Sequence, residues 1–193
     1  MPTAHVEGWG LYSEYLGFEL GLYEDHYARF GHYSFNLLRA CRLVVDTGVH
    51  AMGWSREKAV NFMLNNTAMS KDSVEAEIDR YITWPGQACA YKIGERKIKD
   101  LRTTAAAQIG DKFDVAEFHR AVLKCVGPMS ALETCIERFV ENVRGGKRRE
   151  ESGQGEMSSP VVQSGSGGAV SRAVEWVVLV GWAAGIVRLV NLL

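Results

Sequence analysis

Apolar residues recur every three or four positions from the N-terminus to about residue 144, which is the spacing of amphipathic α-helices. No stretch alternates apolar and polar residues between hairpin turns, as a strand would. The sequence therefore predicts an all-α fold, a helical bundle. The predicted helices span residues 6–23, 33–50, 56–64, 72–82, 86–108, 114–126 and 130–143.

Several of these helices carry recognisable end signals. Serine or aspartate before a helix caps its free N–H groups, proline fits the first turn, and glycine ends the last turn. The signals are Ser55 as an N-cap, Pro85 in a first turn, Gly110 after a last turn, and the capping boxes Asp114–Glu117 and Ser130–Glu133.

The composition divides the chain into three parts, namely a helical region 1–144, a linker 145–168 and an apolar segment 169–193. The linker is polar and rich in glycine and serine, so we expect it to be disordered. Within residues 173–193 the uncharged core, Trp176–Val187, is shorter than the ~20 residues that span a bilayer. A C-terminal membrane anchor, an interfacial or core-docking helix, and a translated non-native reading frame are the three alternatives.

The bulk composition is that of an ordinary soluble protein, with 193 residues, 47% hydrophobic and 23% charged, and a net charge of −1. This charge gives no reason to expect nucleic acid or an anionic membrane as a partner. The four cysteines lie in apolar helical stretches without C-x-x-C pairs, and we expect them to be reduced. With no signal-peptide pattern at the start, the sequence favours a cytoplasmic protein, or alternatively one anchored by its tail.

Glu7 is the first candidate for chemistry. It opens an aromatic-rich segment, EGWGLYSE, and Glu14 follows two helical turns later on the same face. One interpretation is that Glu7 is a metal ligand, with a second carboxylate behind it to orient a ligand. The alternative is two solvated carboxylates on an amphipathic helix.

A second group of polar residues follows the next helix at spacings of three, four and four: Arg39, Arg42, Asp46 and His50. The surrounding run is too apolar for a fully exposed helix, which favours the wall of a cleft over a solvated face. In such a wall an arginine could hold a substrate carboxylate and a histidine could donate to an oxyanion.

Gln87 and Tyr91 form the third group. They lie one helical turn apart in TWPGQACAYKIG, where small residues permit close approach by another helix or a ligand. A phenol near a metal can donate to an oxyanion in peptide hydrolysis. The alternative is a tightly packed helix pair with Tyr91 as an amphipathic core residue.

Four segments in this order, EGWGLYSE, RACRLVVDTGVHAMGWSREKAVNFM, RYITWPGQACAYKIGERKI and FDVAEFHRAVL, resemble the C-terminal half of the domain of unknown function 885 family. The resemblance covers roughly residues 3–143. That family is similar to helical zinc metallopeptidases that combine a His-Glu-x-x-His motif with a later glutamate.

The resemblance implies zinc-dependent peptide hydrolysis by the intact family member, with Glu7 as the third zinc ligand. It further implies that Tyr91 and His50 stabilise an oxyanion and that Arg39, Arg42 and Gln87 bind the peptide substrate. The His-Glu-x-x-His motif is absent from these 193 residues. We therefore expect a peptidase-like fragment that is inactive alone, with a complementing N-terminal half as a partner. The alternative is a non-catalytic helical interaction module, membrane-tethered through residues 173–193.

Overall fold

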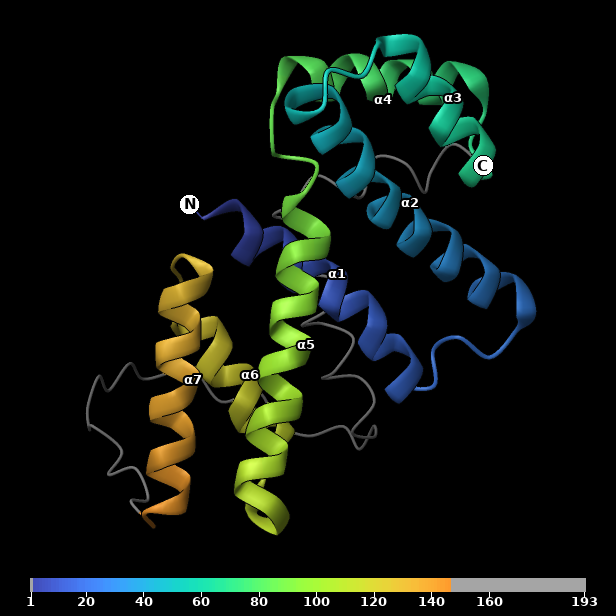
Figure 1. Cartoon of the computed structure of the whole chain (residues 1–193). Coiled ribbons are helices and arrows are strands. Elements are labelled where there is room, and N and C mark those ends of the chain that lie inside the picture. The colour runs from blue at the N-terminus through green and yellow to red at the C-terminus, as the bar shows by residue number, and fades with distance from the viewer. Residues whose placement is uncertain (1, 147–193) are drawn as a thin grey trace, which may run out of the picture. The chain divides into compact units, whose positions relative to one another are not determined.

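All regular structure in the computed structural model, which describes residues 2–146, is helical (Figure 1). This confirms the all-α prediction. The elements in these residues are α1 (Thr3–Glu19), α2 (His26–Ala51), α3 (Arg56–Asn66), α4 (Lys71–Thr83), α5 (Ala90–Ile109), the 3-10 turn η1 (Gly110–Lys112), α6 (Val115–Lys124) and α7 (Met129–Arg144). The predicted linker after Gly146 and the apolar segment 169–193 lie outside the described residues, so their assignments stay predictions.

Helix α2 is longer than predicted, because it begins at His26 and not at Tyr33. Asp25 is its N-cap, and the side-chain carboxylate accepts a hydrogen bond from the N–H of Ala28 at 2.7 Å. Gly31 lies inside the helix and does not interrupt it.

Helix α5 is shorter than predicted, because it begins at Ala90 and not at Gly86. Gly86 has a φ of 79°, in the left-handed region that interrupts a right-handed helix and that glycine adopts without strain. Its N–H is held by both carboxylate oxygens of buried Asp46 at 3.1 Å. The loop that carries Gln87 is therefore fastened to α2.

Most of the other residues that were predicted to begin or end helices do so. Ser55 and Asp114 cap α3 and α6 through their side chains, and Gly110 ends α5 with a φ of 64°. The predicted cap at Ser130 was wrong, because α7 begins at Met129 and Ser130 lies inside its first turn.

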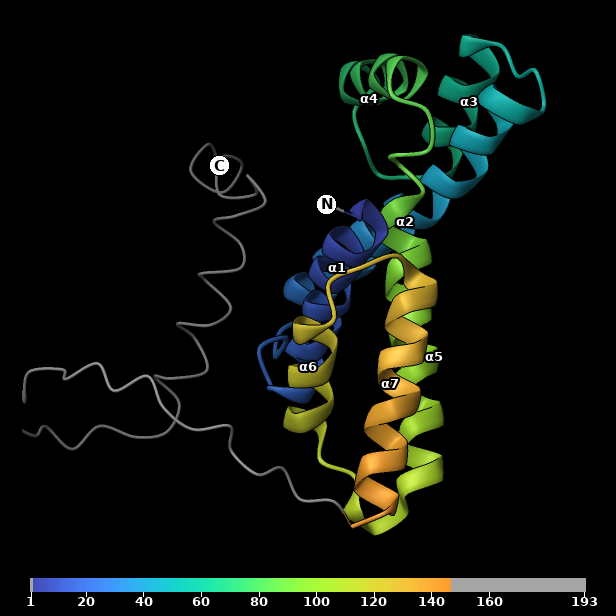
Figure 2. The ribbon, with the colours of Figure 1, turned by 90° about the vertical axis from the view of Figure 1, so that its left-hand side faces the viewer.

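The helices enclose two hydrophobic cores. One is formed mainly by α1, α5, α6 and α7, and contains Tyr12, Ile98, Phe118 and Leu132. The other is formed by α2, α3 and α4, and contains Val45, Met63, Ile78 and Tyr81. Figure 2 shows α7 running along α5, with α6 beside α1.

Helices α1 and α5 meet through a pair of glycines. A Cβ on Gly8 would overlap the backbone of Gly94, and a Cβ on Gly94 would overlap the carbonyl oxygen of Ala4. Because Glu7 directly precedes Gly8, this contact also fixes the position of Glu7 along the axis of α5. Glu7 is thereby set level with the start of α5.

Two of the four cysteines differ from the prediction. Cys41 and Cys89 are free and buried, as expected for small hydrophobic residues. Cys125 and Cys135 form a disulfide, so the prediction that all four are reduced was wrong for this pair. The chain reverses between α6 and α7 and brings these two Cα atoms to 6.4 Å, within the range a disulfide can bridge.

None of the helices in residues 2–146 combines the length and the apolar composition needed to cross a membrane.

Candidate functional site

Glu7 and Gln87 meet where the first turns of α1 face the loop before α5. The Nε2 of Gln87 donates to Oε1 of Glu7 at 3.3 Å. The other end of the same amide is held by Arg80, whose guanidinium donates to Oε1 of Gln87 at 2.9 Å. Because a guanidinium can only donate, this bond fixes the orientation of the amide and turns its NH2 group toward Glu7.

Tyr91 contacts the same NH2 group of Gln87 as Glu7 does. Its hydroxyl oxygen accepts a hydrogen bond from Nε2 of Gln87 at 3.3 Å. Two guanidinium carbons lie near its ring, that of Arg42 at 4.9 Å and that of Arg39 at 6.0 Å from the centroid. The structure therefore brings together five of the six predicted site residues: Glu7, Gln87, Tyr91, Arg39 and Arg42.

Arg42 is buried and is bound by residues of α4, not by Asp46 one turn away. Its Nε donates to the hydroxyl of Tyr81 at 2.7 Å, and Nη2 donates to Oε2 of Glu77 at 2.8 Å. The hydroxyl of Tyr81 also donates to Glu77 at 2.6 Å, and Arg80 donates to both carboxylate oxygens of Glu77. Glu77 thus links Arg42 to the arginine that orients Gln87.

The pKa values in this network follow from its geometry. Burial raises the pKa of Glu77, but hydrogen bonds from Arg80 and Tyr81 and the charge of Arg42 outweigh burial and lower it to about 2. Burial raises the pKa of Tyr81, with Glu77 adding to the effect. At neutral pH the network therefore contains an ionised Glu77 and a neutral Tyr81.

Arg39 pairs with Glu14, which was expected to stand behind Glu7. The Nη2–Oε1 distance is 3.3 Å, and Nη1 of Arg39 donates to the backbone carbonyl of Phe35. Burial raises the pKa of Glu14, and the charge of Arg39 partly offsets this. The group that contacts Glu7 is therefore Gln87, while Glu14 holds Arg39 beside Tyr91.

His50 lies at the end of α2. Its Nε2–H donates to the backbone carbonyl of Tyr81 at 2.9 Å, because a carbonyl can only accept. This bond joins the ends of α2 and α4. The structure gives His50 no hydrogen bond to Glu7, Gln87 or Tyr91, so it does not join the other five predicted residues.

Three residues of the network were missed from the sequence: Glu77, Arg80 and Tyr81. Glu77 and Tyr81 are one turn apart on α4, a spacing that permits a contact. Glu77 lies outside the motifs that drew attention, and nothing in the sequence indicated that α4 would pack with Arg42.

Two histidines, one on α1 and one packed against it, show that the number of histidines in a chain does not indicate its number of metal ligands. Both ring nitrogens of buried His5 lack a hydrogen-bond partner among the described residues, and burial lowers its pKa. Nε2 of His119 and the hydroxyl of Tyr12 form a 2.7 Å hydrogen bond, and the same hydroxyl accepts one from Arg102. His119 therefore joins α6 to α1 inside the first core.

The described residues do not contain a complete set of metal ligands. No group of three or more His, Cys, Asp and Glu side chains in residues 2–146 could hold a metal ion. The carboxylate of Glu7 accepts a hydrogen bond from neutral Gln87, the kind of support that a metal-bound carboxylate usually has. The residues present thus fit one position of a zinc site and do not fit a complete one.

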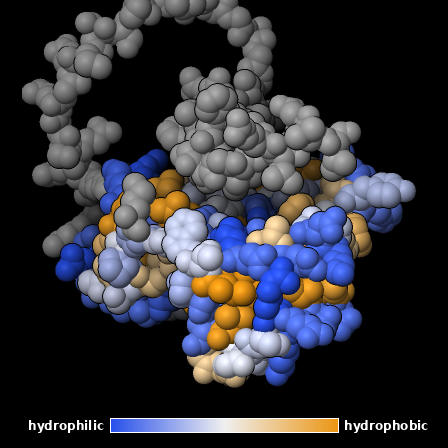
Figure 3. Space-filling view, turned by 90° about the horizontal axis from the view of Figure 1, so that it is seen from above, coloured by the Kyte–Doolittle hydropathy of each residue, from blue (hydrophilic) through white to orange (hydrophobic). Residues whose placement is uncertain are grey.

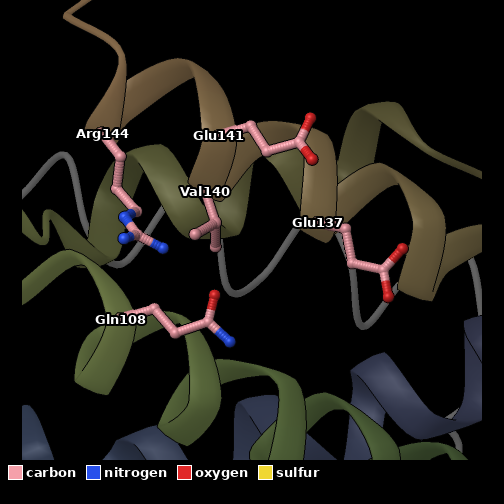
Figure 4. A pocket seen from close by; sticks show the side chains of 5 residues that line it. All are labelled: Gln108, Glu137, Val140, Glu141 and Arg144. Carbon is pink, nitrogen blue, oxygen red and sulfur yellow. The ribbon is translucent and has the colours of Figure 1, made fainter.

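A separate hollow of about 430 Å³ lies between α5 and α7, far along the chain from these residues. Figure 4 shows Gln108 on α5 facing Val140 and Arg144 on α7, with Glu137 and Glu141 at the edge. It is open and contains none of the predicted site residues.

The comparisons agree with this fold. A family described as bacterial proteins of unknown function, DUF885, matches residues 1–134. A crystal structure of a proposed lipoprotein from Colwellia psychrerythraea is similar to the chain, with 46% sequence identity and a TM-score of 0.71. The match covers 72% of this chain and 24% of that one, so the chain spans about a quarter of the relative's length. None of the curated proteins compared with the chain matches it.

The fold and the Glu7–Gln87–Tyr91 cluster define an all-helical protein with a carboxylate held at the meeting point of its helices. The chain belongs to the DUF885 family.

Proposed function

We propose that this chain contributes one ligand, Glu7, to a zinc site of a peptidase-like DUF885 protein. The observation that carries the proposal is the hydrogen bond from Gln87 to Glu7, with the Gln87 amide fixed in turn by Arg80. A carboxylate on a solvated helix face would need no such chain of support. The remaining ligands would come from protein outside residues 2–146.

Zinc, when bound, would supply a Lewis acid for hydrolysis of a peptide bond. Tyr91 accepts from Gln87, which leaves its own O–H proton free to be donated to substrate oxygen. Arg39 and Arg42 lie near its ring, where a substrate carboxylate would share their guanidinium groups with Glu14 and Glu77. The proposed role of His50 as an oxyanion donor has less support, because its Nε2 is already bound to the Tyr81 carbonyl.

The disulfide changes the proposed compartment. Disulfides persist in oxidising compartments and are rare in the cytosol. Together with the lipoprotein description of the relative, the Cys125–Cys135 bond supports a location outside the cytoplasm, in place of the cytoplasmic expectation.

The first test uses the purified chain alone. One carboxylate cannot hold catalytic zinc, so we expect no stoichiometric zinc binding in calorimetry and no cleavage of a peptide library. Tight one-to-one zinc binding with cleavage would overturn the proposal.

The second test restores the rest of the protein. In a chimera, residues 1–146 of this chain replace the matching quarter of the Colwellia psychrerythraea protein. We expect one bound zinc, lost or weakened at least ten-fold by Glu7→Gln and retained in Glu14→Gln, a matched carboxylate on the same helix. Equal zinc affinity in both variants would instead favour a non-catalytic helical module.

A further inference from the structure

The outer side of α2 carries a row of exposed apolar residues. Phe30, Tyr33, Leu37 and Val44 follow one another at spacings of three, four and seven, and Ala40 lies between the last two at the same register. They are 64%, 60%, 49% and 40% exposed. We call these five residues the α2 stripe.

The α2 stripe borders the contacts that hold α2 in the molecule, and the side chains of Phe30, Tyr33, Leu37 and Val44 are exposed beside them. In this half of the helix, His32 packs against Phe18 and Tyr23, and Asn36 accepts a hydrogen bond from Lys92 on α5. At 100° per residue the five stripe positions lie about 40° to 160° around the helix from these two residues.

Single exposed apolar residues are ordinary, and the face in Figure 3 shows such hydrophobic patches among hydrophilic ones. Exposed apolar residues that repeat at helical spacing along one helix differ from such scattered residues, because they form a continuous surface. The stripe extends over four turns, about 21 Å at 1.5 Å per residue. Alternating spacings of three and four are those of a helix that packs along a second helix.

We propose that the α2 stripe is a docking surface for an amphipathic helix from the part of the DUF885 protein that lies outside the matched quarter. The length of that part supports this occupant, since about three quarters of the solved relative lies beyond the region matched by this chain. The inference is independent of the zinc proposal, because the stripe lies on the other side of α2 from Arg39.

A second copy of this chain is a poorer occupant. Paired copies of one helix are usually selected by opposite charges beside the apolar seam. The flanking positions here hold Arg29, Ser34, Asn36 and Leu43, which provide one positive charge and no acidic residue to meet it.

The test uses the full chain, co-produced with the remainder of the Colwellia psychrerythraea protein under a separate affinity tag. We expect the two to co-purify one-to-one by size-exclusion chromatography with light scattering. Leu37→Glu should weaken the complex at least ten-fold, and Phe30→Glu should do the same, because buried apolar anchors dominate such interfaces. The matched control is Leu123→Glu on α6, where the leucine is 44% exposed, and it should change affinity less than two-fold.

Circular dichroism of each variant checks that the chain is folded. Failure of the two proteins to co-purify overturns the proposal, as does a complex that Leu37→Glu and Leu123→Glu affect equally. A dimer of the chain alone that Leu37→Glu abolishes would make a second copy the occupant. If the two proteins bound each other only after removal of residues 169–193, the occupant of the α2 stripe would be that segment of the chain itself.

Discussion

Gly8 on α1 and Gly94 on α5 touch through their backbones, and neither position has room for a Cβ. The contact lies next to Glu7 and one turn beyond Tyr91. The same pair that joins the two helices therefore also sets the distance between Glu7 and the loop of Gln87.

A methyl group at Gly8 is expected to push α1 away from α5. We predict that Gly8→Ala destabilises the chain by about 1–3 kcal/mol, the usual cost of overpacking. Gly10→Ala is the matched control on the same helix, because a Cβ there meets nothing within 4 Å. It should be neutral or stabilising by up to ~1 kcal/mol. Urea denaturation measures the free energy of unfolding of both variants. Equal values would contradict the close contact between Gly8 and Gly94.

The acid sensitivity of the chain is expected to depend on Glu77. Its pKa is lowered from 4.5 to about 2 in the folded chain, so its contribution is complete above pH 4.5 and is lost as pH falls toward 2. A shift of this size corresponds to roughly 3 kcal/mol. Glu77→Gln should be less stable at pH 7 and should lose less stability between pH 4.5 and 2 than the wild type.

Glu75→Gln provides the comparison for this pH dependence, because Glu75 lies on the same helix and makes only long ion pairs, at 3.7 and 3.9 Å. Its urea unfolding should follow the wild-type pH profile. If the free energy of unfolding of Glu77→Gln also followed the wild-type pH profile, this result would contradict the hydrogen-bonded network around Arg42.

Glu95 is a second buried carboxylate, 1% exposed and bound by Lys92 at 2.7 Å and Lys99 at 2.6 Å. Glu95→Ala would remove the carboxylate that neutralises both lysines, and Lys92 would keep only its hydrogen bond to Asn36. We predict a loss of about 3–5 kcal/mol in the free energy of unfolding. The exposed pair Lys97–Glu133, at 2.8 Å, is the contrast, and Glu133→Ala should cost less than ~1 kcal/mol.

The Cys125–Cys135 disulfide closes a short loop across the turn between α6 and α7. Its reduction should lower the free energy of unfolding by about 3 kcal/mol and lower Tm accordingly. The double variant Cys125→Ser/Cys135→Ser should show no response to reductant. Alkylation of the unfolded chain without reductant, followed by mass measurement, should modify two cysteines. Four modified cysteines would show that the bond does not form.

Most of the fold could be predicted from the sequence because its signals are local. Apolar periodicity indicated every helix, and Ser55, Asp114 and Gly110 marked ends correctly. The start of α5 was missed, because it depends on Asp46 of α2 holding Gly86, forty residues away. The disulfide was missed for the same reason, since pairing depends on how α6 and α7 reverse.

The candidate site was predictable in its residues but not in its contacts. The motif containing Gln87 and Tyr91 indicated one face of a helix, which was wrong for Gln87, because α5 begins at Ala90. The two side chains are nevertheless hydrogen-bonded to each other, and Gln87 also contacts Glu7. Glu14 was expected to support Glu7, yet it pairs with Arg39. Which carboxylate meets which arginine is decided by how α1 and α4 lie against α2, which no local pattern records.

The most direct test of the central claim is anomalous diffraction at the zinc edge from crystals of the chimera that carries residues 1–146 of this chain. The account predicts a single zinc peak at about 2.0–2.2 Å from a carboxylate oxygen of Glu7, with Gln87 still bound to that carboxylate. A zinc ion bound elsewhere, with Glu7 still bound only to Gln87, would contradict it.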